Sequence, residues 1–231
     1  MFWRMNEYLT VFTGIYLPYI TLAVFGLAVI YNFFKWMFLP RPVMWAIFPA
    51  KKSLVNILFT IAQRIFSLPG PRKFDKLIFT LSWMFHIGLI VSLSLHAKYI
   101  FTSHLPYEYE VGTTAGMLAA IGSVGFIIRR YADKRADSHF ADYFALILLI
   151  ITLSLGQYIR MFKMVESTHL WTWVQGILTL NPILPPANIL FLMHILFAQI
   201  YMMYLPFKTL IHPIAIFYGQ KIILDSRHVK G

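Results

Sequence analysis

Four histidines lie in two segments that are otherwise almost entirely apolar, and imidazole is the side chain of this chain best suited to bind a metal. His86 and His96 share a run without Asp, Glu, Lys or Arg. His194 and His212 share a run whose one charged side chain is Lys208. Imidazole in a hydrocarbon environment needs a partner, and an ionisable side chain within a membrane segment is by default a functional residue. The pattern therefore predicts metal coordination inside a bilayer.

The composition is that of an integral membrane protein. Hydrophobic residues make up 59% of the chain, charged residues 13%, and the mean hydropathy is +0.67; soluble domains are typically about 25% charged. The beginning, MFWRMNEY, does not resemble a cleaved signal peptide, so the first apolar run is expected to be retained. The chain has no cysteine, which excludes iron–sulfur clusters, covalently attached haem, disulfides and thiol catalysis within it.

The apolar runs predict five membrane spans in one domain over 1–231, because a spanning helix needs about 20 apolar residues. The expected spans are about 8–34, 77–97, 111–128, 140–160 and 188–212. Small residues in the third span favour close helix packing in lipid.

The net charge of +11 comes mostly from basic residues in alternate connections and the carboxyl-terminal tail. Positive loops beside a bilayer explain this better than nucleic-acid binding, so no nucleic-acid partner is expected. The positive-inside rule places the amino terminus outside and the carboxyl terminus in the cytoplasm of a multi-pass cell-membrane protein.

The long inner connection contains a second expected element, an amphipathic helix over 53–68. Apolar residues recur there at helical spacing, and Pro69-Gly70-Pro71 ends the pattern. Such a helix lies in the membrane interface; an alternative role is a docking surface for a cytoplasmic partner.

The four histidines form two pairs at matching depth if the second and fifth spans run antiparallel. His86 then faces His212 near the inner side, and His96 faces His194 near the outer side. Ten residues of helix rise about 15 Å and eighteen about 27 Å, so the depths do not match perfectly. Pro206 can kink or tilt the fifth helix enough to reduce the difference.

Two ligand pairs a leaflet apart indicate two bis-histidine haems b, whose iron atoms take the four histidines as axial ligands. Zinc usually gathers three or four ligands around one ion. An iron with both axial positions filled suits electron transfer rather than oxygen chemistry. The predicted fold is thus an all-α, five-helix membrane bundle with two haems between its second and fifth helices.

Other functions stay open from the residues alone. A single membrane histidine is commonly a polar contact between helices, and several can serve as proton-relay groups in a transporter or a non-redox anchor. Against a transporter, the spans show no repeated halves and no carboxylate at depth.

The histidine spacing resembles that of the gamma subunits of respiratory nitrate reductases, cytochromes b with five spans. That family has two histidines ten residues apart on the second helix and two eighteen apart on the fifth, as here. The stretches NPILPPANILFLMHILFAQIYMMYLPFKTLIH and RRYADKRADSHFADYFALILLI are more similar to one branch. That branch holds the membrane subunit of the sulfite-reductase-associated complex and its heterodisulfide-reductase relatives. The likeness covers most of residues 8–228.

The resemblance implies exchange of electrons with menaquinone near the outer haem and with a cytoplasmic iron–sulfur subunit, heterodisulfide-reductase-like, near the inner haem. It also implies further membrane and periplasmic partner subunits and a role in sulfur metabolism. The nitrate reductase subunit itself, and the dihaem subunits of hydrogenases or formate dehydrogenases, are alternatives, although the spacing favours the nitrate reductase type. The direction of electron flow is left open.

Polar residues on the outer side are candidates for the quinone site: Lys98, Tyr158, Arg160, Lys163, Glu166 and His169. Arg160 and Lys163 are equally candidates for pairing with haem propionates, because a carboxylate favours a nearby cation. Snorkelling to the interface is the simpler role for both. The remaining histidines, His104, His139 and His228, are expected in loops or the tail.

Overall fold

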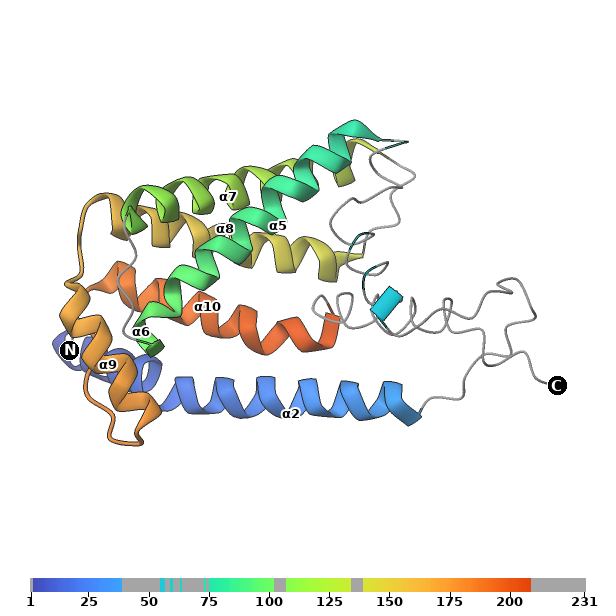
Figure 1. Ribbon diagram of the computed structural model, residues 1–231. Helices are drawn as coiled ribbons and strands as arrows, with labels where there is room; N and C mark the ends of the chain where they lie inside the picture. Colours follow the sequence, from blue (N-terminus) through green and yellow to red (C-terminus); the bar gives the residue numbers. More distant parts are fainter. Residues whose placement is uncertain are drawn as a thin grey trace.

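The computed structural model describes residues 2–38, 55, 56, 59, 63, 73, 75–101, 107–133 and 139–208. Every regular element in these ranges is helical (Figure 1). In chain order they are α1 (Phe2–Val11), the π-helix η1 (Phe12–Tyr16), α2 (Leu17–Phe38), α5 (Lys76–His96), α6 (Lys98–Phe101), α7 (Glu108–Ala132), α8 (Phe140–Met161), α9 (Ser167–Leu178) and α10 (Ile189–Lys208).

Five helical segments are long and apolar enough to cross a bilayer, which confirms the predicted number of spans. They are Glu7–Lys35, Lys76–Phe101, Glu108–Ala132, Phe140–Met161 and Ile189–Phe207. Between 17% and 33% of each apolar window is buried inside the protein. Most residues of each window are therefore at least partly exposed, as expected where lipid is the surrounding solvent. The chain is an all-α, multi-pass membrane protein.

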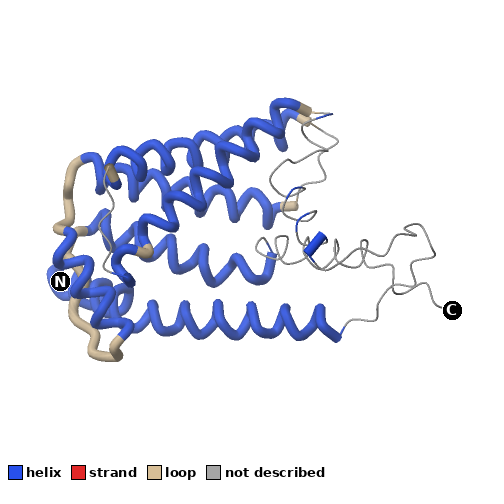
Figure 2. Tube along the Cα trace, in the orientation of Figure 1, coloured by secondary structure: helices blue, strands red, loops and turns tan. Residues whose placement is uncertain are grey.

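The long helices pack in the order α5, α7, α8, α10 and α2. Figure 2 shows them as long rods, with α9 and tan connecting segments at one end. Ala119 of α7, Leu149 of α8 and Tyr201 of α10 belong to one buried apolar cluster, so α8 packs between α7 and α10. Helices α5 and α10 do not pack extensively on each other. The two helices that carry the predicted ligands are therefore held by α7 and α8 rather than by direct contact.

Small residues let α5 and α7 approach closely. A Cβ atom added to Gly88 of α5 would lie 2.5 Å from the Ala115 carbonyl oxygen and 2.6 Å from the Ala119 nitrogen. On α7, a Cβ at Gly122 would lie 2.8 Å from the backbone nitrogen of Phe85. This contact is the small-residue packing that the third span predicted.

The π-helix provides the attachment of the first span to the rest of the bundle. A π-helical turn offsets the normal hydrogen-bond ladder, so its carbonyl groups can accept bonds from elsewhere. Gln199 Nε2 donates to the Thr13 carbonyl at 3.0 Å, and Trp173 Nε1 donates to the Gly14 carbonyl at 2.8 Å. Helices α9 and α10 thereby hold the amino-terminal span in place.

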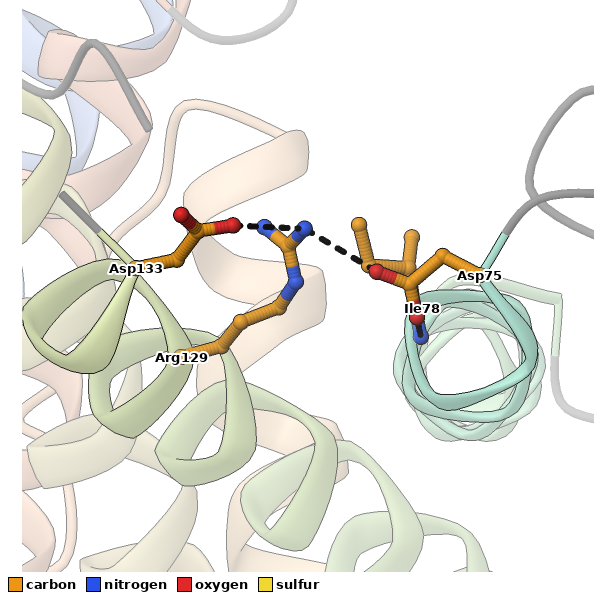
Figure 3. Close-up of polar contacts among 4 residues, drawn as sticks. All are labelled: Asp75, Ile78, Arg129 and Asp133. Carbon is orange, nitrogen blue, oxygen red and sulfur yellow. Dashed lines mark hydrogen bonds and ion pairs between the residues drawn. The ribbon is translucent and has the colours of Figure 1, made fainter. Parts of the chain in front are cut away.

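Ion pairs of Arg129 join the beginning of α5 to the end of α7 (Figure 3). The Asp75 carboxylate caps α5 by accepting from the Ile78 N–H at 2.9 Å, and it accepts from Arg129 of α7 at 3.1 Å. Arg129 also lies 3.6 Å from Asp133. These contacts fix the depth of α5 against α7, because the cap and the ion pair share one carboxylate.

Two sequence expectations fall largely outside the described residues. Of the expected amphipathic helix over 53–68, only residues 55, 56, 59 and 63 are described. The described part of the fifth span ends at Lys208, so His212 lies beyond it. The connection between the fourth and fifth spans contains a helix, α9, that the apolar pattern did not predict.

Candidate functional site

The rings of His96 and His194 face the same place between α5 and α10. Their centroids lie 6.4 Å apart and their planes differ by 28°. His96 is on the last turn of α5, and His194 is on the second turn of α10. The bundle thus brings together two histidines that are 98 positions apart in the sequence, on two helices that otherwise make little contact.

Hydrogen bonds fix the Nδ1 atoms of the two histidines on α5. His86 Nδ1 lies 2.7 Å from the Ser82 carbonyl, and His96 Nδ1 lies 2.7 Å from the Ser92 carbonyl. A carbonyl oxygen can only accept, so each Nδ1 carries the hydrogen. The Nε2 atom of each ring is then the nitrogen with a lone pair for a metal, which is the usual arrangement of a ligating histidine.

His194 is oriented by a neighbouring helix. Its Nδ1 donates to the Thr152 carbonyl of α8 at 2.9 Å. The ring rests against Gly156, one turn further along α8, where an added Cβ would lie 2.8 Å from the His194 Cε1 atom. The absence of a side chain at Gly156 is therefore what allows this ring to lie against α8.

The spacing of the His96 and His194 rings fits two ligands of one haem iron. A metal–imidazole bond is about 2 Å long, so two imidazoles binding one ion from opposite sides place their centroids roughly 6 Å apart. The observed 6.4 Å agrees with that spacing. His96 is exposed although it lies within a span. Among the described residues no three His, Asp or Glu side chains gather to form a larger metal site.

A cluster of charged residues lies beside His96. Lys98 Nζ and Glu108 Oε1 are 2.6 Å apart, and Arg160 Nη1 donates to the Glu108 carbonyl at 3.0 Å. Gly112 leaves room for the Arg160 guanidinium, because a Cβ there would overlap it.

Glu108 was not among the residues that the sequence predicted for this cluster. The available signal was its place ten residues after Lys98 and three residues before the expected third span, where an acidic side chain favours the amino terminus of a helix. Gly156 and Thr152 were not predicted either, because their roles depend on contact with another helix.

The other quinone-site candidates have different surroundings. The Tyr158 ring packs on Phe162 with centroids 4.5 Å apart. Lys163 is exposed, with a left-handed backbone at φ 48°. Glu166 is the exposed residue preceding α9, and His169 Nε2 lies 3.2 Å from the Leu184 carbonyl. Of the six candidates, Lys98 and Arg160 are the two that the structure joins through Glu108.

The remaining histidines are placed only in part. His139 is exposed at the beginning of α8, where its backbone N–H donates to Asp142. His104, His212 and His228 lie outside the described residues. Of the pair expected on the inner side, only His86 is described, and metal coordination by either pair stays a prediction.

The fold and these side chains define a class: a multi-pass membrane protein that holds a histidine pair between two of its helices. The sequence profile of the nitrate reductase gamma subunit family matches residues 74–223, and the chain belongs to that family. It is therefore a membrane subunit of cytochrome b type in a redox complex. No curated protein matches the chain. The family resemblance drawn from the histidine spacing is confirmed at this level.

Proposed function

We propose that the chain carries electrons across the membrane through two bis-histidine haems b. The outer haem binds between His96 and His194, and the inner haem between His86 and His212. The observation that carries this proposal is the pair of rings with centroids 6.4 Å apart, together with the Nδ1 bonds that direct Nε2 to a metal. A haem iron held by these histidines would supply one-electron transfer.

The inner pair rests on His86 and on sequence spacing. His86 is half-buried on α5, ten residues before His96, and its Nδ1 is held in the same way as that of His96. Ten residues of helix separate the two ligands by about 15 Å along the axis. Two haems at these depths form a path between the two membrane surfaces, with the amino terminus outside and the carboxyl terminus in the cytoplasm.

The charged cluster on the outer side serves the outer haem and menaquinone. Arg160 presents a planar guanidinium, which is the side chain best suited to a propionate carboxylate. Glu108 offsets the charge of Lys98, so the cluster carries a net single positive charge rather than two. Menaquinone meets the chain on this side, and Lys98 and Arg160 are the two candidates that Glu108 joins.

The inner haem exchanges electrons with a cytoplasmic iron–sulfur subunit of heterodisulfide-reductase type, in a complex of dissimilatory sulfur metabolism. The choice of partner and of sulfur metabolism rests on the amino-acid sequence of the fifth span and of the connection between the third and fourth spans. A nitrate reductase complex is the alternative. The chain has no cysteine for a cluster of its own, so substrate chemistry belongs to partner subunits.

The test is a dithionite-reduced minus oxidised spectrum of the purified chain, with haem counted as the pyridine haemochrome. Two b-type haems per chain are expected. A folded, monodisperse chain without haem after expression in a haem-sufficient host would overturn the proposal and favour a proton-relay role for the histidines.

A further inference from the structure

The carbonyl groups that accept hydrogen bonds from the histidine rings lie on the same helix for two of the rings and on a neighbouring helix for the third. His86 and His96 donate to the carbonyl four residues earlier on their own helix, α5. His194 instead donates to Thr152 of α8, 42 positions away in the sequence, at 2.9 Å. The orientation of the His194 ring therefore depends on how α8 and α10 pack, whereas that of His96 is built into one helix.

Two features of α8 hold the His194 ring. The Thr152 carbonyl accepts its Nδ1–H, and Gly156 gives it a flat surface: an added Cβ would lie 2.8 Å from Cε1, 3.3 Å from Nδ1 and 3.6 Å from Nε2. The Thr152 hydroxyl is not involved, because it donates to the Leu148 carbonyl within α8 at 2.8 Å. The holding groups are thus a backbone oxygen and a missing side chain.

We infer that the Thr152 carbonyl and Gly156 of α8 are positioning groups that set the ring plane and the electron donation of His194 as an axial ligand of the outer haem. This inference rests on the proposed haem function. A hydrogen bond from Nδ1–H to a carbonyl makes the imidazole a stronger donor, which stabilises the oxidised metal. The contact with α8 therefore keeps the potential of the outer haem lower than an unbonded imidazole would.

The first experiment compares Gly156→Ala with Gly26→Ala. Both replace a helical glycine by alanine and gain the same intrinsic helix preference, but a Cβ at Gly26 meets nothing within 4 Å. Redox titration and low-temperature electron paramagnetic resonance follow both haems. We expect Gly156→Ala to raise the midpoint potential and shift the largest g value of the outer haem, or to release that haem. Gly26→Ala and the inner haem should keep wild-type values.

The second experiment isolates the hydrogen bond and does not depend on whether Gly156→Ala folds. His194→Gly leaves space for a free ligand between Gly156 and the Thr152 carbonyl. Added imidazole can donate to that carbonyl, whereas 1-methylimidazole has no N–H to donate. We expect imidazole to restore the wild-type potential, and 1-methylimidazole to restore low-spin iron at a higher potential.

Each result bears on the inference. Equal potentials with the two added ligands, no restoration by imidazole, or unchanged outer-haem spectra in Gly156→Ala would each overturn it. A wild-type chain without haem would instead defeat the proposed function, so the two failures are distinguishable.

Discussion

The His96 and His194 rings lie 6.4 Å apart between two helices that do not pack closely on each other. Helices α7 and α8 hold this spacing: α7 fixes α5 through small residues, and α8 fixes α10 through apolar packing and through the Thr152 carbonyl. Substitutions in the α5–α7 contact and in the α8–α10 contact should therefore affect the proposed haem sites differently.

Single ligand variants should remove one haem each. In the proposed arrangement His96→Ala would remove one axial ligand of the outer haem, and His86→Ala one of the inner haem, so each variant is expected to bind half the wild-type haem. Pyridine haemochrome counts together with redox titration measure this. His169→Ala, an exposed histidine bonded to the Leu184 carbonyl, is the matched control and should bind the full complement. Equal loss in all three variants would contradict the assignment of ligands.

Removing a negative or a positive charge beside His96 should shift the midpoint potential of the proposed outer haem in opposite directions. Glu108→Gln removes a negative charge and should raise the midpoint potential, because a more positive surrounding favours the reduced iron. Lys98→Met should lower it. The side chains are only partly exposed, at 16% for Lys98 and 29% for Glu108, so solvent screens their charges incompletely. We expect each substitution to shift the midpoint potential by on the order of 1 kcal/mol, roughly 40 mV. Shifts of the same sign in a redox titration would show that the pair does not act through its charge.

Gly88→Ala should loosen the contact between α5 and α7. Its methyl group would meet the Ala115 carbonyl at 2.5 Å and the Ala119 nitrogen at 2.6 Å, both on the backbone, which cannot move aside as a side chain can. Overpacking of this kind costs about 1–3 kcal/mol. Thermal unfolding in detergent should show a lower midpoint, with Gly26→Ala as the control. Unchanged stability would mean that α5 and α7 are less tightly packed than the structure shows.

Acid should weaken the cap of α5. The Ile78 N–H that donates to Asp75 lowers the pKa of this carboxyl below its usual 3.8, and the Arg129 ion pair adds to the effect, while partial burial opposes it. Its folded-state pKa is thus lower than its unfolded-state pKa. The stabilisation is complete above about pH 4 and is lost as the pH falls through the folded-state pKa.

Two variants separate the cap from the charge. Asp75→Asn keeps a good capping side chain but loses the ion pair with Arg129, whereas Asp75→Ala loses both. Thermal midpoints measured between pH 3 and pH 7 should fall with acid for wild type and change less for Asp75→Asn. Asp75→Ala should be the least stable of the three at neutral pH. If the thermal midpoint of Asp75→Asn depends on pH as that of the wild type does, the acid effect belongs to another group.

Properties that depend on neighbouring residues along the chain could be predicted from the sequence. Five apolar runs of spanning length predict five membrane helices, and the structure has five such helices among its described residues. The spacing of His86, His96, His194 and His212 indicated the family that the sequence profile identifies. The helix α9 and the offset carbonyls of η1 were not predicted, because both depend on contacts with distant helices.

By itself the sequence determined the membrane class, the number of spans and the family, because each depends on apolar length or on spacing along one helix. The tertiary structure alone decided which groups meet. Glu108 joins Lys98 and Arg160 across three helices, and His194 takes its orientation from Thr152 and Gly156 of α8. The physical reason is that a glycine or a backbone carbonyl has no side chain whose pattern could indicate its role. Such groups acquire a function only when packing brings a partner from another helix against them.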